Sequence, residues 1–122
     1  MSHWTGRVTV SSTGNNAFTG IGFQPTWMNL RVSKKTSTTE TVEHLCIGSA
    51  DGTRQNCSYI YGDSTSRTTD DFNTKCISHW ERISGVLTEV LSCTFVSFDA
   101  DGFTLNAVAG NANYRVTVDC GN

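Results

Sequence analysis

Turn-forming residues interrupt this sequence at short intervals, and the segments between them have β character. The clearest segment is 26–33, TWMNLRVS, in which Met28, Leu30 and Val32 alternate with more polar neighbours. Alternation with a period of two places one set of side chains on each face of a strand. Because no stretch shows a period of 3.6 residues with helix caps, the sequence predicts an all-β chain.

Other segments of the same kind lie between turns rich in glycine, asparagine, serine and threonine. They are 7–10, 17–23, 41–50, 53–61, 75–82, 86–98, 103–108 and 114–120. We expect a turn at 13–16 and polar loops at 34–39 and 62–74. Eight or nine short antiparallel strands are typical of a sandwich, and about eight strands with long connections make a jelly roll. The sequence therefore predicts one jelly-roll-like β-sandwich domain over residues 1–122.

An Asp-Gly pair at 51–52 is a strong hairpin signal, and a cysteine lies on either side of it. If the pair forms a two-residue turn, Ala50 faces Thr53 and Cys46 faces Cys57. Facing residues have Cα atoms about 4.5 or 5.5 Å apart, within the disulfide range of about 4.4–6.8 Å. The spacing fits a disulfide-linked hairpin, and it equally fits two reduced cysteines side by side.

A second hairpin is expected around residues 84–85, Ser-Gly, and it repeats this pattern. A two-residue turn there places Cys76 opposite Cys93, with the same two alternatives of a disulfide or two buried thiols. The fifth cysteine, Cys120, has no partner in this scheme. It is either a buried thiol or a cross-link to another chain.

Charge and hydropathy exclude several classes of protein. The net charge of −2 gives no electrostatic footprint for binding nucleic acid. No apolar run reaches the about 20 residues that a membrane helix needs, so we expect no membrane insertion. The N-terminal segment MSHWTGRVTV lacks the basic and apolar regions of a signal peptide, and synthesis in a cytosol is expected.

The spacing of histidine, cysteine, aspartate and serine residues in the sequence matches no motif for metal binding or catalysis. The histidines lie far apart in the sequence, at His3, His44 and His79, and no CxxC pair occurs. Asp70-Asp71 lies in a polar loop, and DADG at 99–102 is better explained as a hairpin turn than as a calcium loop. No G-x-S-x-G elbow is present. We therefore expect no metal, no cofactor and no enzymatic activity.

Tryptophans are the best candidates for binding. Trp27 falls on the polar face of its strand beside Asn29 and Arg31, where an exposed indole could stack on a sugar or a partner. Trp80 is a second candidate for a ligand or interface. The competing explanation for both is packing between sheets or subunits.

Four stretches, in the same order, resemble segments of bacteriophage tail and virion-associated β-proteins. They are AFTGIGFQPTWMNLRV at 17–32, IGSADGTRQNCSY at 47–59, SFDADGFTLN at 97–106 and ANYRVTV at 112–118. The resemblance implies a virion protein with a jelly-roll-like sandwich, at a tail-fibre tip or on the capsid surface. Such domains are often trimers, and the family supplies no catalytic residues to carry over.

We thus expect a bacteriophage virion structural protein made in the host cytoplasm. Because the first motif begins close to Met1, a small decoration or tail-fibre-tip module is favoured over a fibre shaft. Its expected partners are further copies of itself as a trimer, other virion proteins and a cell-surface glycan. The alternative function is a lectin-like, carbohydrate-binding β-sandwich module.

Overall fold

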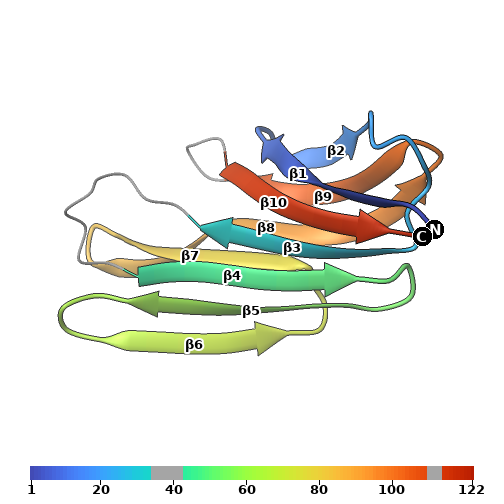
Figure 1. Cartoon of the computed structure of the whole chain (residues 1–122). Coiled ribbons are helices and arrows are strands. Elements are labelled where there is room, and N and C mark those ends of the chain that lie inside the picture. Colours follow the sequence, from blue (N-terminus) through green and yellow to red (C-terminus); the bar gives the residue numbers. More distant parts are fainter. Residues whose placement is uncertain (34–42, 110–113) are drawn as a thin grey trace.

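The computed structural model describes residues 1–33, 43–109 and 114–122, which form two antiparallel sheets packed face to face (Figure 1). The larger sheet has the strand order β1 (His3–Val10), β10 (Tyr114–Gly121), β3 (Trp27–Ser33), β4 (Glu43–Ala50), β5 (Gln55–Gly62) and β6 (Arg67–Phe72). The smaller sheet has the order β2 (Gly14–Phe18), β9 (Gly102–Ala109), β8 (Val86–Asp99) and β7 (Ile77–Ile83). The predicted all-β sandwich is confirmed. No helix that could cross a membrane occurs in the described ranges.

Ten strands are present in the described residues, where eight or nine were predicted. The segment 62–74, predicted as a loop, contains β6, and the predicted turn at 13–16 contains the start of β2. β6 is an edge strand that pairs with β5, and most of its side chains are exposed. A strand that buries little on either face lacks the alternation that reveals half-buried strands. The predicted loop at 34–39 lies outside the described residues.

Alternate residues of the two sheets form the core. Met28, Leu30 and Val32 are buried on β3, as the alternation predicts. Phe103 and Leu105 are fully buried on β9 in the facing sheet and belong to the same hydrophobic cluster. The pattern agrees with an inner face and an outer face on each sheet.

The hairpin between β4 and β5 has a longer turn than the predicted Asp-Gly pair. Ala50 pairs with Gln55, so the predicted pairing of Ala50 with Thr53 is wrong. Asp51 closes the turn, because its Oδ1 accepts hydrogen bonds from the backbone N–H of Thr53 at 3.0 Å and of Arg54 at 2.7 Å. The aspartate side chain thus stabilises a four-residue loop, as in an Asx turn.

The longer turn shifts the register by two residues and changes the cysteine neighbours. Cys46 faces Tyr59 and Cys57 faces Gly48, so the predicted direct pairing of the two cysteines is wrong. They are instead diagonal neighbours, and both thiols are free and buried. The Cys57 thiol donates a hydrogen bond to the Cys46 sulfur, which lowers the pKa of Cys46 and raises the pKa of Cys57.

The second hairpin keeps its predicted two-residue turn at 84–85 but contains a β-bulge. Val90 is the extra residue of β8, and beyond it the register moves by one, so Cys93 faces Ile77 instead of the predicted Cys76. The backbone N–H of Cys76 donates to the Cys93 carbonyl at 2.9 Å, and both thiols are free. Cys120 is a fully buried free thiol on β10.

One glycine sets how closely the sheets approach each other. A Cβ atom on Gly48 would lie 1.7 Å from the carbonyl oxygen of Cys76. The chain entering β7 therefore crosses directly over β4, where only glycine leaves room. This crossing carries β7 over the inner face of β4 and β5.

Two of the segments that carry the resemblance meet at the turn between β8 and β9. Asp101, in the turn between β8 and β9, accepts hydrogen bonds from the backbone N–H of Gly20 at 2.9 Å and of Gly22 at 2.6 Å. Asp99 accepts from the hydroxyls of Ser97 and Thr104, each at 2.7 Å. Both carboxylates therefore have structural roles in a hairpin turn, in agreement with the turn predicted at 99–102.

Candidate binding face

The outer face of the six-stranded sheet carries three of the four residues that the sequence singles out for binding, Trp27, Asn29 and Arg31. We call this surface, on β10, β3, β4 and β5, the Trp27 face. The register places Asp119, Asn29, Ser49 and Asn56 side by side in one row across these four strands. A second row contains Arg31, Ile47 and Ser58. Polar side chains from four strands are thereby held at fixed spacing on a rigid support.

Shallow hollows run across this face. One, of about 450 Å³, lies over both rows and includes Asn29, Arg31 and Asn56 in its lining. A second, of about 320 Å³, extends toward Trp27 and the 51–54 turn. A third, of about 490 Å³, lies between β5 and β6. Asn56 lines all three hollows, so its side chain is the one that they share.

Trp27 lies at one end of the face and is 37% exposed. Gly121 is its partner on β10, and a Cβ atom there would come within 2.6 Å of the indole. The absence of a side chain on Gly121 therefore lets the indole lie close to the β10 backbone. The His3 ring stacks beside it, with centroids 6.1 Å apart and planes inclined by 27°. The indole is thus held in place while part of it remains in solvent.

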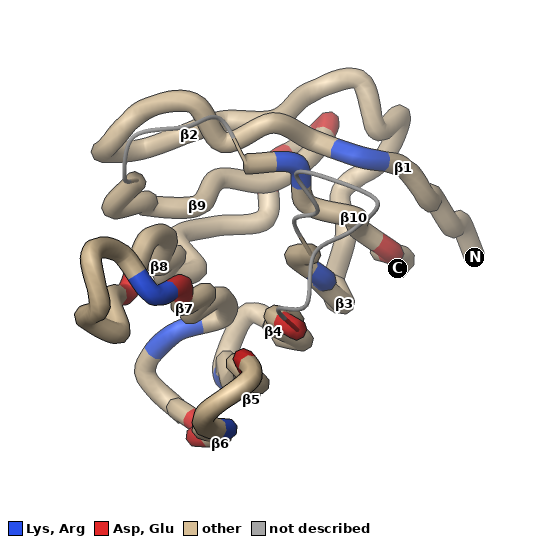
Figure 2. The backbone as a smooth tube through the Cα atoms, turned by 90° about the vertical axis from the view of Figure 1, so that its left-hand side faces the viewer, with Lys and Arg blue, Asp and Glu red and all other residues tan. Residues whose placement is uncertain are grey.

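Charged groups border the hollows. The backbone N–H groups of Arg54 and Thr53 lower the pKa of the Asp51 carboxyl at the Trp27 end. Asp119, on β10 beside Asn29, accepts a hydrogen bond from the Thr5 hydroxyl at 2.7 Å. Figure 2 shows positive and negative positions interspersed around the described part of the sandwich. The Trp27 face therefore carries both positively and negatively charged side chains, which donate and accept hydrogen bonds respectively.

Trp80 lies away from this face. Its ring stacks on Tyr59, with centroids 5.3 Å apart, between β7 and the inner side of β5. Its indole N–H donates to the Ser78 hydroxyl at 2.8 Å, and that hydroxyl donates to Glu89 at 2.5 Å. The structure thus brings Trp27, Asn29 and Arg31 together and leaves Trp80 in inter-sheet packing.

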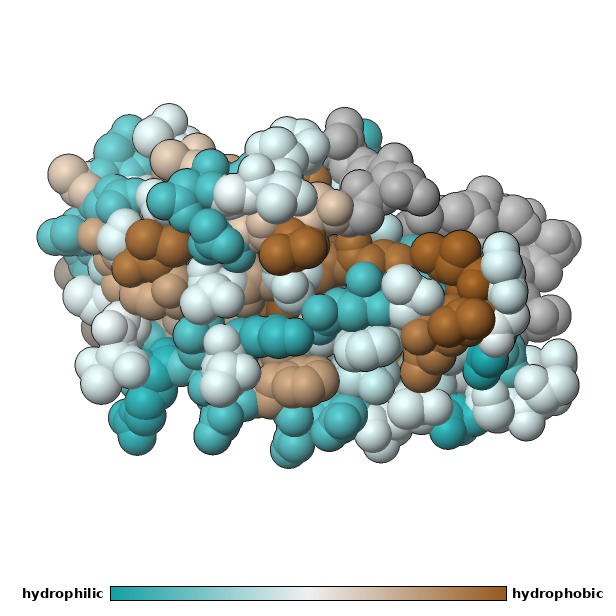
Figure 3. Space-filling view, turned by 180° about the vertical axis from the view of Figure 1, so that it is seen from behind, coloured by the Kyte–Doolittle hydropathy of each residue, from teal (hydrophilic) through white to brown (hydrophobic). Residues whose placement is uncertain are grey.

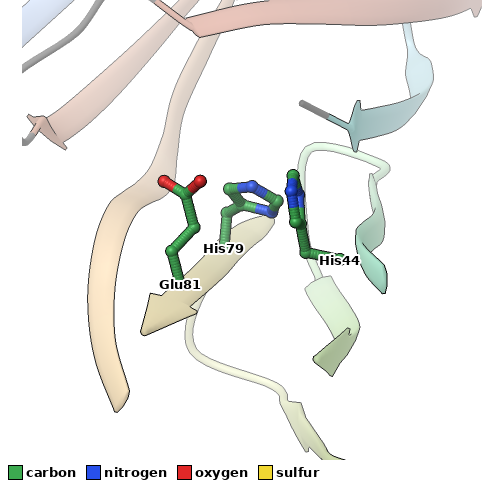
Figure 4. A group of neighbouring side chains, drawn as sticks. All are labelled: His44, His79 and Glu81. Carbon is green, nitrogen blue, oxygen red and sulfur yellow. The ribbon is translucent and has the colours of Figure 1, made fainter. Parts of the chain in front are cut away.

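The histidines, scattered in the sequence, fall into two places. His3 is exposed beside Trp27, whereas His44 and His79 are buried between the sheets together with Glu81 (Figure 4). Among the described residues, these two buried histidines and the half-buried glutamate have the donor chemistry and the proximity to hold a metal ion. Sequence spacing gives no sign of this cluster, because the strand crossing at Gly48 creates it.

Ser49, Asn56 and Ser58 belong to the face but were not predicted as site residues. Their alternation with buried neighbours on β4 and β5 could have placed them on an outer face, but only the pairing of strands places them beside Asn29 and Arg31. No family model, curated protein or solved structure matches this chain.

Proposed function

We propose that the chain is a bacteriophage virion module, a decoration or tail-tip protein, that binds carbohydrate through the Trp27 face. One observation carries the binding part of the proposal. A partly exposed indole lies on β3 two residues from Asn29, beside a cross-strand row of carboxylate, amide and hydroxyl groups, and shallow hollows cover both. The virion part is supported by the resemblance of four segments, two of which contact each other through Asp101.

The chemistry of the face suits a sugar. Sugar hydroxyls both donate and accept hydrogen bonds, and the amides of Asn29 and Asn56 supply both functions in one side chain. Arg31 adds donors, and the Asp119 carboxylate adds an acceptor. The apolar face of a sugar ring can pack on the indole of Trp27, as aromatic side chains with a polar handle do at interfaces. Because the groups stand on paired strands, no loop has to be ordered on binding.

A glycan array followed by titration calorimetry tests this function. We expect Trp27→Ala and Asn56→Ala each to weaken binding of the best glycan by about tenfold or more, the loss of one to two good contacts. Ile60→Ala is the matched control, because Ile60 is 44% exposed on the outer face of β5 and lines none of the three hollows described above. A blank array, or equal affinity of Trp27→Ala and wild type, would remove the carbohydrate proposal.

Self-association is the second candidate function, and a specific surface favours it. The outer side of the four-stranded sheet exposes apolar side chains among polar ones (Figure 3). They include Val108 at 60% and Val96 at 45%, and the hairpin between β7 and β8 adds exposed Val86 at 63% and Ile83 at 45%. Apolar groups on an otherwise polar surface are typical of a protein–protein contact. The proposed occupant is another copy of this chain, in line with the trimers implied by the resemblance.

Light scattering under reducing and non-reducing conditions tests the assembly. A trimer that survives reductant, and that Val86→Lys together with Val108→Lys dissociates, is the expected result. Thr69→Lys, exposed on β6 of the other sheet, is the control for added charge. A monomer at high concentration would contradict the assembly proposal while leaving carbohydrate binding to be decided by the array.

A further inference from the structure

A buried cluster of two imidazoles and one carboxylate links the two sheets. His44 extends from β4, while His79 and Glu81 extend from β7, and Figure 4 shows the three side chains turned toward one another. One ligand atom from each residue lies within 4.8 Å of the other two. The His44 and His79 ring centroids are 5.2 Å apart, in an edge-on arrangement.

The fold explains how residues distant in sequence meet. His44 lies on the inner face of β4, on the same side as Gly48, over which the chain crosses into β7. His79 and Glu81 are two residues apart on β7, and this spacing places side chains on one side of a strand. The crossing therefore brings His79 and Glu81, on that side of β7, close to His44 on β4.

Burial makes the cluster unusual for a structural core. His79 is fully buried, His44 is 9% exposed and Glu81 is half-buried. The Nδ1 atom of His44 is buried and has no hydrogen-bond partner among the described residues. A buried polar atom without a partner costs free energy, so most such atoms in proteins are satisfied. A ligand in the cluster would supply the missing interaction.

Tyr114 provides the outer support that metal-binding carboxylates commonly have. Its hydroxyl, on β10, donates a hydrogen bond to Glu81 Oε2 at 3.3 Å. Second-shell donors of this kind orient a ligating carboxylate and tune its basicity.

We propose that His44, His79 and Glu81 bind one divalent transition-metal ion of the zinc class, which joins β4 to β7. Two imidazole nitrogens and one carboxylate oxygen are a donor set for zinc and for related first-row ions, whereas calcium and magnesium prefer oxygen alone. Bonds of about 2.0–2.1 Å place donor atoms of a tetrahedral ion about 3.4 Å apart. Small rotations of the three side chains therefore close the cluster around the ion, and water completes the coordination.

The first test uses the native chain in a phosphine reductant, titrated with ZnSO₄. We expect one zinc per chain, a melting temperature raised by several degrees and reversed by EDTA, and no shift with MgSO₄. X-ray absorption of the zinc-loaded protein should show nitrogen and oxygen at about 2.0–2.1 Å without the sulfur shell at about 2.3 Å. Absence of binding, or a sulfur shell from the cysteines, would overturn the proposal.

Variants then assign the ligands. His44→Gln and Glu81→Gln should each weaken zinc binding by about tenfold or more, the scale expected even for the loss of a supporting residue. His3→Gln, at the exposed histidine beside Trp27, is the matched control and should bind as wild type does. Circular dichroism checks that each variant folds. If His44→Gln unfolds, the half-buried Glu81→Gln and the absorption spectrum decide, and wild-type affinity in Glu81→Gln would overturn the proposed ligand set.

Discussion

Gly48 and Asp101 show how single residues place larger elements. Gly48 acts through the absence of a side chain, since β4 and the chain entering β7 touch at its Cα. Asp101 acts through its carboxylate, which fixes the 20–22 segment against the turn between β8 and β9. Neither residue forms part of the hydrophobic core, yet each determines where strands of the two sheets lie.

Gly48→Ala is expected to destabilise the fold. The added methyl would meet the Cys76 carbonyl oxygen, a backbone atom that cannot rotate away, and overpacking of this kind costs about 3 kcal/mol. Ser49→Ala is the neighbouring control, because it removes an exposed hydrogen bond to Asn56 and should cost less than about 0.5 kcal/mol. Urea denaturation monitored by circular dichroism measures both. Equal midpoints for the two variants would contradict the close crossing.

Asp101→Asn should make the fold less dependent on pH in the acid range. The backbone N–H groups of Gly22 and Gly20 lower the pKa of the Asp101 carboxyl below its usual value of 3.8. The ionised group therefore contributes stability above pH 3.8, and this contribution is lost as the pH falls through the folded-state pKa. We expect wild type to exceed Asp101→Asn in stability at pH 7, with the difference shrinking toward pH 2. A difference that stays constant or grows on acidification would contradict this role.

For the two hairpins, the sequence predicts where each turn lies but not which residues of the paired strands face each other. Both turns were predicted in the right place, because Asp-Gly and Ser-Gly pairs favour chain reversal. Their registers were not, since Asp51 closes a four-residue loop and Val90 forms a bulge. The length of the first turn and the position of the bulge depend on hydrogen bonds and on packing across the sandwich. A shift of one or two residues in register is enough to move every cysteine pair.

The same limit applies to the candidate sites. Alternation along one strand places Trp27, Asn29 and Arg31 on a common face, and all three line the outer surface of β3. Their neighbours on β4 and β5 depend on strand order, which local pattern does not contain. The buried histidine cluster depends on a crossing between sheets and was missed for that reason.

Ser84→Asn is expected to stabilise the β7–β8 hairpin. Ser84 has a φ of 50° and Gly85 a φ of 82°, which are the positive values of a type I′ turn. Asparagine tolerates this backbone conformation better than serine, so a gain of about 0.5 kcal/mol is expected. Ser84→Ala, which lacks a polar side chain to support the positive φ, should shift the urea midpoint the other way. A loss of stability in Ser84→Asn would exclude this turn geometry.

For the whole molecule, the interior between the sheets gathers reactive groups away from solvent. All five cysteines are buried free thiols. Burial raises the pKa of Cys93 to about 12 and also raises the pKa of Cys76 and Cys120. Because thiols react as thiolates, both the high pKa and the lack of access protect them. Opening of the sandwich is then the event that exposes them.

Thiol labelling should therefore report on the cooperative opening of the sandwich. In native buffer with an aromatic disulfide reagent, we expect almost no reaction at any of the five cysteines, and complete reaction in guanidinium chloride. The labelling rate across intermediate urea should follow the unfolded fraction measured by circular dichroism, because a buried group reacts only after opening. Opening also breaks the hydrogen bond from Cys57 that lowers the pKa of Cys46 in the folded chain, so we expect no cysteine to react ahead of the others. Mass spectrometry of partly labelled protein identifies the site. Fast labelling of Cys120 in native buffer would instead show that β1 and β10 separate from the rest of the sandwich before the core opens.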